Sequence, residues 1–263
     1  MHRILHWASI ALISLFIAGC ASTGNNGASS ERRAEVLYEE ARSSLGNGNY
    51  AQAIERFEDL VARYPFGTHA VQSQMMIIYA HYRAGQHESA IAAAERFQRM
   101  HPRNEHIAYA LYMSGVARQA KGPGGLSGLF GVDERLRDPE PKRRAFADFE
   151  ELLERYPESE YADDAQERME EIRAHLADYE LYVGRFYLER KAYIAAAKRA
   201  RTVIARYPGT PAVPEAMTLL ADSYRGLGLE PLDQRVEEEL RELHQAPAPV
   251  PSLGESAAVL PPP

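Results

Sequence analysis

The sequence predicts an all-α fold built as a solenoid of five stacked helix pairs, and three observations carry this prediction. A single phrase, in which a turn precedes an apolar stripe that ends in Tyr-Pro or His-Pro, occurs four times. Its copies end at Pro65, Pro102, Pro157 and Pro208. Within the first copy, Ala53, Phe57 and Leu60 lie at i, i+4 and i+7, which places them on one face of a helix. No stretch alternates at period two for long enough to predict a strand.

Each copy of the phrase predicts a turn between two helices, followed by the second helix of the pair. Gly48 and Asn49 stop the first helix of the first copy, because both residues tolerate left-handed backbone angles. Pro65 ends the second helix, because proline disfavours helical geometry in the residue before it. The predicted pairs are 31–47 with 50–64, 68–84 with 87–101, 106–121 with 140–156, 160–190 with 192–207, and 211–227 with 230–244.

The repeat length indicates which kind of helix pair this is. Two helices in about 34 residues, with a Gly/Tyr/Ala/Phe/Pro pattern, are the signature of the tetratricopeptide repeat. Neighbouring pairs bury each other's apolar faces, so five of them are expected to stack into a right-handed superhelix over residues 31–244. An insertion at 121–141 splits the third pair, and an unusually long helical pattern at 160–190 opens the fourth.

Composition and charge narrow the class of function. The chain has 263 residues, of which 45% are hydrophobic and 25% charged, as expected for a folded protein rather than a disordered one. The net charge is −7, and the 30 Lys and Arg residues are dispersed along the chain. A nucleic-acid-binding protein would need a clustered positive surface. We therefore expect no nucleic-acid partner.

The N-terminal residues predict export. Arg3 precedes a short apolar run from Ile10 to Ile17, which is too short to span a bilayer and is typical of a signal peptide, here residues 1–19. The run ends in Leu15-Phe16-Ile17-Ala18-Gly19-Cys20, which resembles the lipobox of bacterial lipoproteins and implies a covalent lipid on Cys20. The alternative is an ordinary signal with an incidental cysteine, but Cys20 is the only cysteine and a polar stretch follows it.

The same region predicts how the chain is held at a membrane. Residues 20–30, rich in Ser, Gly and Asn, predict a flexible tether behind the lipid. Acyl chains contribute about 0.8 kcal/mol per buried methylene, so more than one chain makes a stable anchor. Ala21 rather than Asp follows the cysteine, which by resemblance to sorted lipoproteins favours the periplasmic face of the outer membrane.

At the C-terminal end of the chain, six prolines within 245–263 predict a disordered or polyproline-II tail.

No catalytic or metal-binding constellation is recognisable in the sequence. The histidines are scattered, without a His-Glu-x-x-His pattern or a cysteine partner. Gly122-Pro123-Gly124-Gly125 lacks the Lys-Ser/Thr end of a phosphate loop, and no Gly-x-Ser-x-Gly motif occurs. The acidic pairs Asp163-Asp164 and Glu170-Glu171 are expected on the solvated face of the long helix. We therefore expect neither an enzyme nor a cofactor, apart from the lipid.

The first helix of each tetratricopeptide pair lines the concave groove of such an array, and its positions here predict a peptide-binding surface. Tyrosine suits peptide recognition, because its ring supplies contact area at low entropy cost while its hydroxyl keeps a partner. The alternative is that several of these side chains pack between helices, as we expect of Tyr50 and Tyr193. The predicted groove residues are Tyr38, Leu45, Met75, Tyr79, Tyr82, Tyr109 and Tyr112.

The insertion from Lys121 to Pro141 is unusually apolar for a loop. It contains Leu126, Leu129, Phe130 and Val132. A loop with this many apolar residues either folds back against its own protein or docks a partner. Both interpretations stay open: a cap on the groove and a docking element.

Several phrases together resemble the BamD family (also called ComL), the lipoprotein subunit of the outer-membrane β-barrel assembly machinery. The resemblance covers about residues 20–244, and it is specific because generic repeats do not carry the Phe-Gly-Val-Asp insertion. The proline-rich tail departs from the family, so nothing transfers to it. The phrases are Arg63-Tyr64-Pro65-Phe66-Gly67, Ile78-Tyr79-Ala80-His81-Tyr82, Tyr109-Ala110-Leu111-Tyr112-Met113-Ser114-Gly115, Leu129-Phe130-Gly131-Val132-Asp133 with Arg137-Asp138-Pro139, Ala145-Phe146-Ala147-Asp148-Phe149, Ala192-Tyr193-Ile194-Ala195-Ala196 and Tyr207-Pro208-Gly209-Thr210.

The resemblance implies a scaffold without enzymatic activity. Its N-terminal half, about 31–157, would receive the C-terminal segments of unfolded outer-membrane proteins, which commonly end in an aromatic residue. Tyr64 and Phe66 fall in that implied region. Its C-terminal half, about 158–244, would hold the periplasmic domains of the barrel subunit BamA, with Arg199 in the contact.

The sequence predicts further partner contacts, and two other functions are compared with the family role. Phe130 and Asp133 of the matched insertion are candidates for partner binding, and other Bam lipoproteins would bind elsewhere on the array. A pilotin-like lipoprotein that escorts a secretin would share the anchor and repeats, but should lack the long insertion and the Tyr-Pro-Phe-Gly phrase. A periplasmic hydrolase would need a separate catalytic domain, for which no residues are left.

Overall fold

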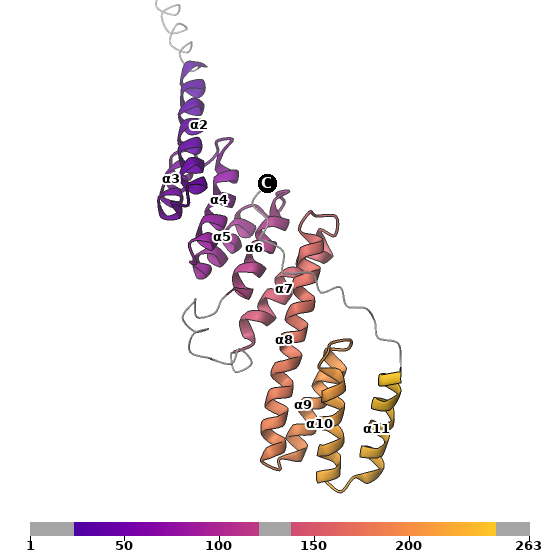
Figure 1. Ribbon diagram of the computed structural model, residues 1–263. Coiled ribbons are helices and arrows are strands. Elements are labelled where there is room, and N and C mark those ends of the chain that lie inside the picture. The colour runs from indigo at the N-terminus through magenta and orange to yellow at the C-terminus, as the bar shows by residue number, and fades with distance from the viewer. Residues whose placement is uncertain (1–23, 121–137, 246–263) are drawn as a thin grey trace, which may run out of the picture. The chain divides into compact units, whose positions relative to one another are not determined.

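The computed structural model describes residues 24–120 and 138–245, and helices account for all the regular structure of these residues (Figure 1). The prediction of an all-α fold of tetratricopeptide-like helix pairs is confirmed. None of these helices is both long and apolar enough to cross a bilayer. The helices are α2 (Gly24–Gly46), α3 (Tyr50–Arg63), α4 (Ala70–Arg83), α5 (His87–Met100), α6 (Ile107–Gln119), α7 (Glu140–Arg155), α8 (Ala162–Glu189), α9 (Tyr193–Arg206), α10 (Val213–Gly226) and α11 (Glu230–Gln245).

The chain divides into two compact units, Met1–Ala93 and Ala94–Pro263, with the division inside α5. In the first, the N-terminal unit, α2 packs on α3 and α3 on α4. In the second, the C-terminal unit, each helix from α6 to α11 packs on the next, and α8 also contacts α10. The two functional halves implied by the family resemblance, divided near residue 157, stay a prediction.

Four turns between helices share one backbone conformation. In each, one residue has a positive φ, and the following N–H donates to the carbonyl five residues earlier, at 2.9–3.0 Å. This is the hydrogen bond that closes a helix C-terminus over a left-handed residue. Gly48 takes that conformation as predicted, whereas Asn49 has a φ of −80° and does not. The left-handed residues are Gly48, Gly85, Lys191 and Gly228.

The Tyr-Pro phrases end their helices as predicted. Tyr64, Tyr156 and Tyr207 each leave helical geometry, with φ between −138° and −126°, while their N–H groups still donate to the carbonyl four residues earlier. The proline that follows cannot continue the helix, because it has no N–H to donate. The same backbone therefore recurs in three second helices.

The apolar stripes of the second helices form the core. Ala53, Phe57 and Leu60 have no exposed surface, and neither do Ala145, Phe149 and Leu152 of α7.

Two glycines allow aromatic side chains of a neighbouring helix to pack directly against the backbone. A Cβ on Gly115 would lie 2.6 Å from the Phe149 ring, and one on Gly226 would lie 2.4 Å from the Tyr193 ring. Tyr193 thus packs between helices, as predicted.

One predicted boundary differs from the structure, and several predicted sites fall outside its described part. Helix α2 begins at Gly24, within the segment that composition assigned to a tether. Once a helix is nucleated, each further residue adds one hydrogen bond, so a strong helical pattern at 31–46 can extend over weak helix formers. Cys20, Phe130 and Asp133 lie outside the described residues, as does the tail after residue 245, so their roles stay predictions.

Candidate binding surfaces

Two of the predicted groove residues in the N-terminal unit belong to its core. The Tyr38 ring stacks on His69 with centroids 4.7 Å apart and lies 5.8 Å from Phe57, leaving 3% of the residue exposed. Burial raises the pKa of its hydroxyl above the ordinary value. Met75 is buried as well. The prediction that these two side chains line a groove is wrong, because both are buried in the unit.

Tyr79 and Tyr82 of α4 keep part of their surface. Arg83 donates a hydrogen bond from Nη1 to the Tyr79 hydroxyl at 2.7 Å, and its guanidinium lies over the Tyr79 and Tyr50 rings. The Tyr82 ring lies 5.7 Å from His87. Both side chains are partly exposed, so both residues remain candidates for peptide contact.

Phe66 is the most exposed large apolar side chain of the described residues. It sits in the turn between α3 and α4, and 99% of it is accessible to solvent. The Gly67 N–H donates to the Tyr64 carbonyl at 3.0 Å and fixes the turn on which the ring is displayed. Tyr64 is half-buried beside it. A solvated phenyl ring loses unfavourable hydration as soon as a partner covers it.

Tyr109 and Tyr112 of α6 are wholly buried, so their predicted place in a groove is wrong. The Tyr161 ring covers both, at centroid distances of 5.6 and 5.0 Å, and Tyr112 also lies against Phe149. The physical reason is that α6 is apolar on nearly every side, with each residue from 107 to 117 buried. A helix that is apolar all round is surrounded by protein, so helical spacing does not identify an open face.

A polar cluster that the sequence did not reveal joins α6 to α7. Ser114 Oγ donates to Asp148 at 2.7 Å, and Arg118 Nε donates to the same carboxylate at 2.8 Å. Arg118 also pairs with Glu95 of α5. Burial raises the pKa of Asp148, although Ser114 and Arg118 oppose that shift. These groups bind one another, which makes the cluster a structural link rather than an open site.

The acidic pairs of α8 are only partly on the solvated face. Asp163 is exposed as predicted, but Asp164 is buried and accepts a hydrogen bond from Arg168 Nε at 2.5 Å. Arg168 in turn lies over the Tyr112 ring and donates to Gln119. The solvated-face prediction is wrong for Asp164, because a carboxylate can be buried where an arginine neutralises it.

Arg199 holds a buried carboxylate. Its Nη1 donates to Glu180 of α8 at 2.7 Å, and Arg143 of α7 lies 3.6 Å from the other carboxylate oxygen. The bond to Glu180 raises the pKa of Arg199. Glu180 is 4% exposed, whereas 37% of the Arg199 side chain stays accessible. A glutamate within an apolar stripe of α8 was the sequence signal for this pair.

Among residues 24–120 and 138–245, no group of three or more His, Cys, Asp or Glu side chains is placed to hold a metal ion.

Comparisons with known proteins agree with the sequence resemblance. The family model described as "Outer membrane lipoprotein" (YfiO) matches residues 30–240. The outer membrane protein assembly factor BamD of Vibrio cholerae is 41% identical over 202 residues, which is 77% of this chain and 84% of that protein. BamD of Neisseria meningitidis serogroup A is 37% identical over 232 residues, or 87% and 86% of the two chains.

Similarity to solved structures is weaker. A tetratricopeptide repeat protein from Parabacteroides merdae aligns with 80% of this chain and 80% of its own. The sequence identity is 14% and the TM-score is 0.38. A likeness of that size adds nothing to the description of the fold given by the helices themselves.

Proposed function

The chain belongs to the BamD family of outer-membrane lipoproteins, and on that premise we propose that it is a scaffold of outer-membrane protein assembly. The relatives described above are assembly factors by name. In this role the N-terminal half, about 31–157, receives the C-terminal segments of unfolded outer-membrane proteins. The C-terminal half, about 158–244, holds the periplasmic domains of BamA, and other Bam lipoproteins bind elsewhere.

The observation that carries the proposal is the display of Phe66. An aromatic ring that is 99% exposed on a fixed turn is an unusual use of a large apolar side chain, because it forgoes burial in a core. Tyr79 and Tyr82 of the same unit add two further partly exposed rings. Aromatic anchors of this kind dominate the energetics of peptide binding.

In this proposal, the covalent lipid anchors the chain to the outer membrane. We propose that Cys20 carries the acyl chains and that Ala21 directs the chain to the periplasmic face of the outer membrane. Two or more acyl chains give a stable anchor. Cys20→Ser would then leave the chain in the soluble periplasmic fraction, and metabolic labelling with an alkyne-tagged palmitate would label only the unsubstituted chain.

Partner capture tests the assembly role. The tagged full-length chain is purified from detergent-solubilised membranes, and the proteins that co-purify are identified. The proposal expects the barrel subunit BamA among them. Recovery of a secretin without BamA would instead support the pilotin-like function and would contradict the proposal. The family relatives favour the assembly role, since those named above are assembly factors and not pilotins.

Arg199 needs a control when it is tested as a BamA contact. Replacing it disturbs the buried Glu180 as well as the surface, so loss of binding in Arg199→Gln alone would have two causes. Glu180→Gln leaves the Arg199 guanidinium in place without its internal carboxylate. A direct contact predicts that Arg199→Gln weakens BamA capture while Glu180→Gln preserves it. Equal losses in both variants would contradict a direct contact.

A further inference from the structure

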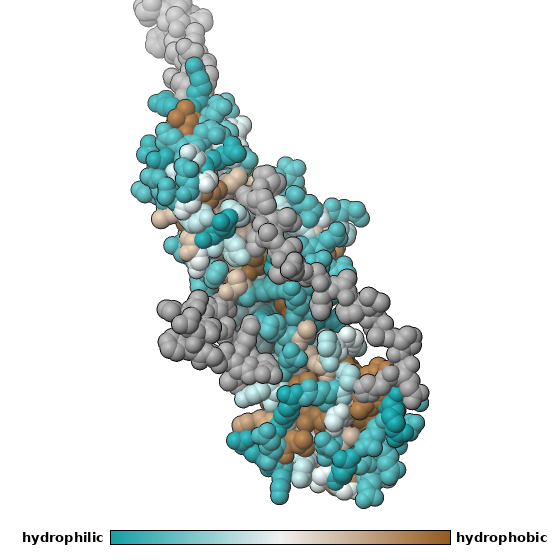
Figure 2. All heavy atoms as spheres, viewed as in Figure 1, coloured by the Kyte–Doolittle hydropathy of each residue, from teal (hydrophilic) through white to brown (hydrophobic). Residues whose placement is uncertain are grey.

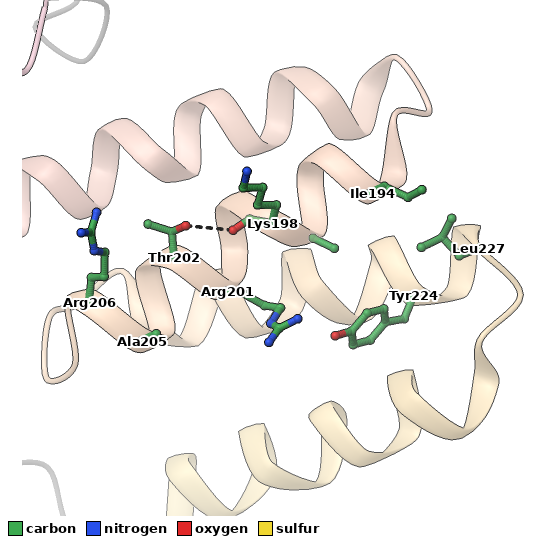
Figure 3. Close-up of a pocket in the computed structure, with 9 residues that line it drawn as sticks. Ile194, Lys198, Arg201, Thr202, Ala205, Arg206, Tyr224 and Leu227 are labelled. Carbon is green, nitrogen blue, oxygen red and sulfur yellow. Dashed lines mark hydrogen bonds between the residues drawn. The ribbon is translucent and has the colours of Figure 1, made fainter.

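An open depression of about 530 Å³ lies on the C-terminal unit, between α9 and the end of α10 (Figure 3). We call it the α9–α10 groove. Ile194, Lys198, Arg201 and Arg206 line it from α9, and Tyr224 and Leu227 from the end of α10. In Figure 3, Arg201 and Tyr224 point toward one another. Arg199 is not part of the lining, because its guanidinium turns to Glu180.

The groove carries positive charge without neutralisation from the described residues. Lys198, Arg201 and Arg206 have no carboxylate within 4 Å in the part of the chain that the structure describes. The acidic helix α11 does not supply one. Its Asp233 and Glu237 pair with Arg225, which reaches Asp222 of α10 as well. Three neighbouring cations of one helix therefore favour a ligand that brings an anionic group.

The groove is also apolar at one end. Ile194 is 75% exposed, and Leu227 is partly exposed next to it. Figure 2 shows hydrophobic residues reaching the surface over the C-terminal helices, bordered by hydrophilic ones. The ligand that fits has an acidic side chain for the cations and apolar side chains for the Ile194 end. Tyr224 adds an aromatic ring, which is the kind of surface that proline-rich segments dock on.

The chain itself contains a segment with this chemistry. Residues 246–263 hold six prolines, no Lys or Arg, and one acidic residue, Glu255. Val259 and Leu260 follow Glu255 after a short interval. A proline-rich segment favours the extended polyproline-II conformation, so it loses little entropy on docking. Its charge has the opposite sign to that of the groove.

The segment starts within reach of the groove. Helices α9 and α11 each pack on α10 and run in the same direction, so α11 ends at Gln245 on the side where α9 ends at Arg206 (Figure 1). The ten residues from Gln245 to Glu255 span up to about 31 Å in polyproline II. The groove-lining part of α9, from Ile194 to Arg206, is about 18 Å long at 1.5 Å per residue.

We propose that residues 246–263 dock in the α9–α10 groove of their own chain. The proline-rich beginning crosses from α11 and enters at Arg206. Glu255 pairs with Arg201 and Lys198, and Val259 and Leu260 cover Ile194 and Leu227. The docking is intramolecular, so a weak contact suffices, because the tether provides a millimolar effective concentration. The segment then competes with any acidic partner for the same cations, a form of regulation independent of Phe66.

Cysteine cross-linking in the full-length chain tests the proposal. Ser256→Cys is combined with Thr202→Cys, whose hydroxyl bonds the Lys198 carbonyl beside the groove. The matched control combines Ser256→Cys with Thr218→Cys of α10, whose hydroxyl bonds the Pro214 carbonyl and which does not line the groove. We expect an intramolecular disulfide at Thr202 roughly tenfold faster than at Thr218, given the local concentration that docking creates.

Charge variants show whether the groove chemistry is responsible. Lys198→Glu with Arg201→Glu should reduce the Thr202 cross-link to the rate of the Thr218 control. Glu255→Gln should reduce it several-fold, and Arg103→Glu, at an exposed cation outside the groove, should not change it. Unchanged circular dichroism and unfolding midpoints show that each variant is folded.

Three results would overturn the proposal. Equal rates for the Thr202 and Thr218 pairs would mean that the segment samples the surface without docking. A disulfide between two chains, seen as a dimer on a non-reducing gel, would place the segment on a second copy. Absence of any disulfide would leave the groove to a separate protein that presents an acidic, apolar segment.

Discussion

The tyrosines of α4 in the N-terminal unit are partly exposed, whereas those of α6 in the C-terminal unit are buried. Tyr79 and Tyr82 of α4 are partly exposed, but Tyr109 and Tyr112 of α6 have no accessible surface, although the two helices carry similar tyrosine-containing phrases. The difference lies in the other residues of each helix. Helix α4 has glutamines, a histidine and Arg83, which need water, while α6 has no charged residue before Arg118. The exposure of a tyrosine therefore depends on the polarity of the other residues of its helix.

The largest expected effect comes from truncating the buried ring. Tyr112→Ala would remove a side chain that touches Tyr161 and Phe149, and we expect a loss of about 3–5 kcal/mol in the free energy of unfolding. Tyr79→Ala, the matched change on α4, should lose about 1 kcal/mol or less, since its hydrogen bond to Arg83 is exposed. Urea unfolding followed by circular dichroism measures both. Similar losses would erase the contrast between the units.

A second contrast is between Arg199, which pairs with a buried glutamate in the C-terminal unit, and Arg83, which is exposed in the N-terminal unit. Among the described residues, Arg199→Gln leaves the buried Glu180 with only the longer contact to Arg143, so we expect a loss of about 1–3 kcal/mol. Arg83→Gln breaks an exposed bond to Tyr79 and surface contacts with the Tyr79 and Tyr50 rings, so we expect a loss below about 1 kcal/mol. The double variant Arg199→Gln with Glu180→Gln should recover part of the loss, because no buried charge is then left unpaired. An Arg199→Gln variant as stable as Arg83→Gln would show that Glu180 is solvated.

The smallest expected effect is a gain. The turns after α2 and α4 use Gly48 and Gly85 at the left-handed position, but the turn after α8 uses Lys191 with a φ of 57°. A left-handed conformation costs a residue other than glycine about 1–2 kcal/mol, and glycine's own chain entropy offsets part of that. Lys191→Gly should therefore stabilise the C-terminal unit by about 0.5–1 kcal/mol, measured by urea unfolding. Gly228→Ala, at the same position of the last turn, should destabilise it, and a stabilising alanine there would contradict this reading of the turn.

The fold was largely predictable because its signals are local. Helical spacing, the Tyr-Pro phrase and the glycine turns each depend on a few neighbouring residues, and the predicted pairs match the observed helices to within two residues from 47 to 245. The Lys191 turn was also bounded correctly, although its residue is not a glycine. Only the start of α2 was misplaced.

The candidate site was less predictable, because burial depends on residues far away in the sequence. Tyr112 is covered by Tyr161, and Asp164 is neutralised by Arg168 under the ring of Tyr112. Spacing along α6 gives no information about these contacts. Phe66 came from the family resemblance, and its exposure followed only from the structure. Glu180 could have been found, since a charged residue in an apolar stripe implies a partner of opposite sign.

Peptide binding by the N-terminal unit can be measured by titration with a fluorescent peptide that ends in phenylalanine and carries the C-terminal sequence of an outer-membrane protein. We expect Phe66→Ala to weaken binding roughly tenfold or more, as loss of an aromatic anchor does, and Tyr79→Ala with Tyr82→Ala to weaken it less. Phe186→Ala, which truncates another exposed phenylalanine in the C-terminal unit, should leave the affinity unchanged. Equal affinities for Phe66→Ala, Phe186→Ala and the unsubstituted chain would mean that the N-terminal unit does not receive the peptide through its exposed aromatic turn.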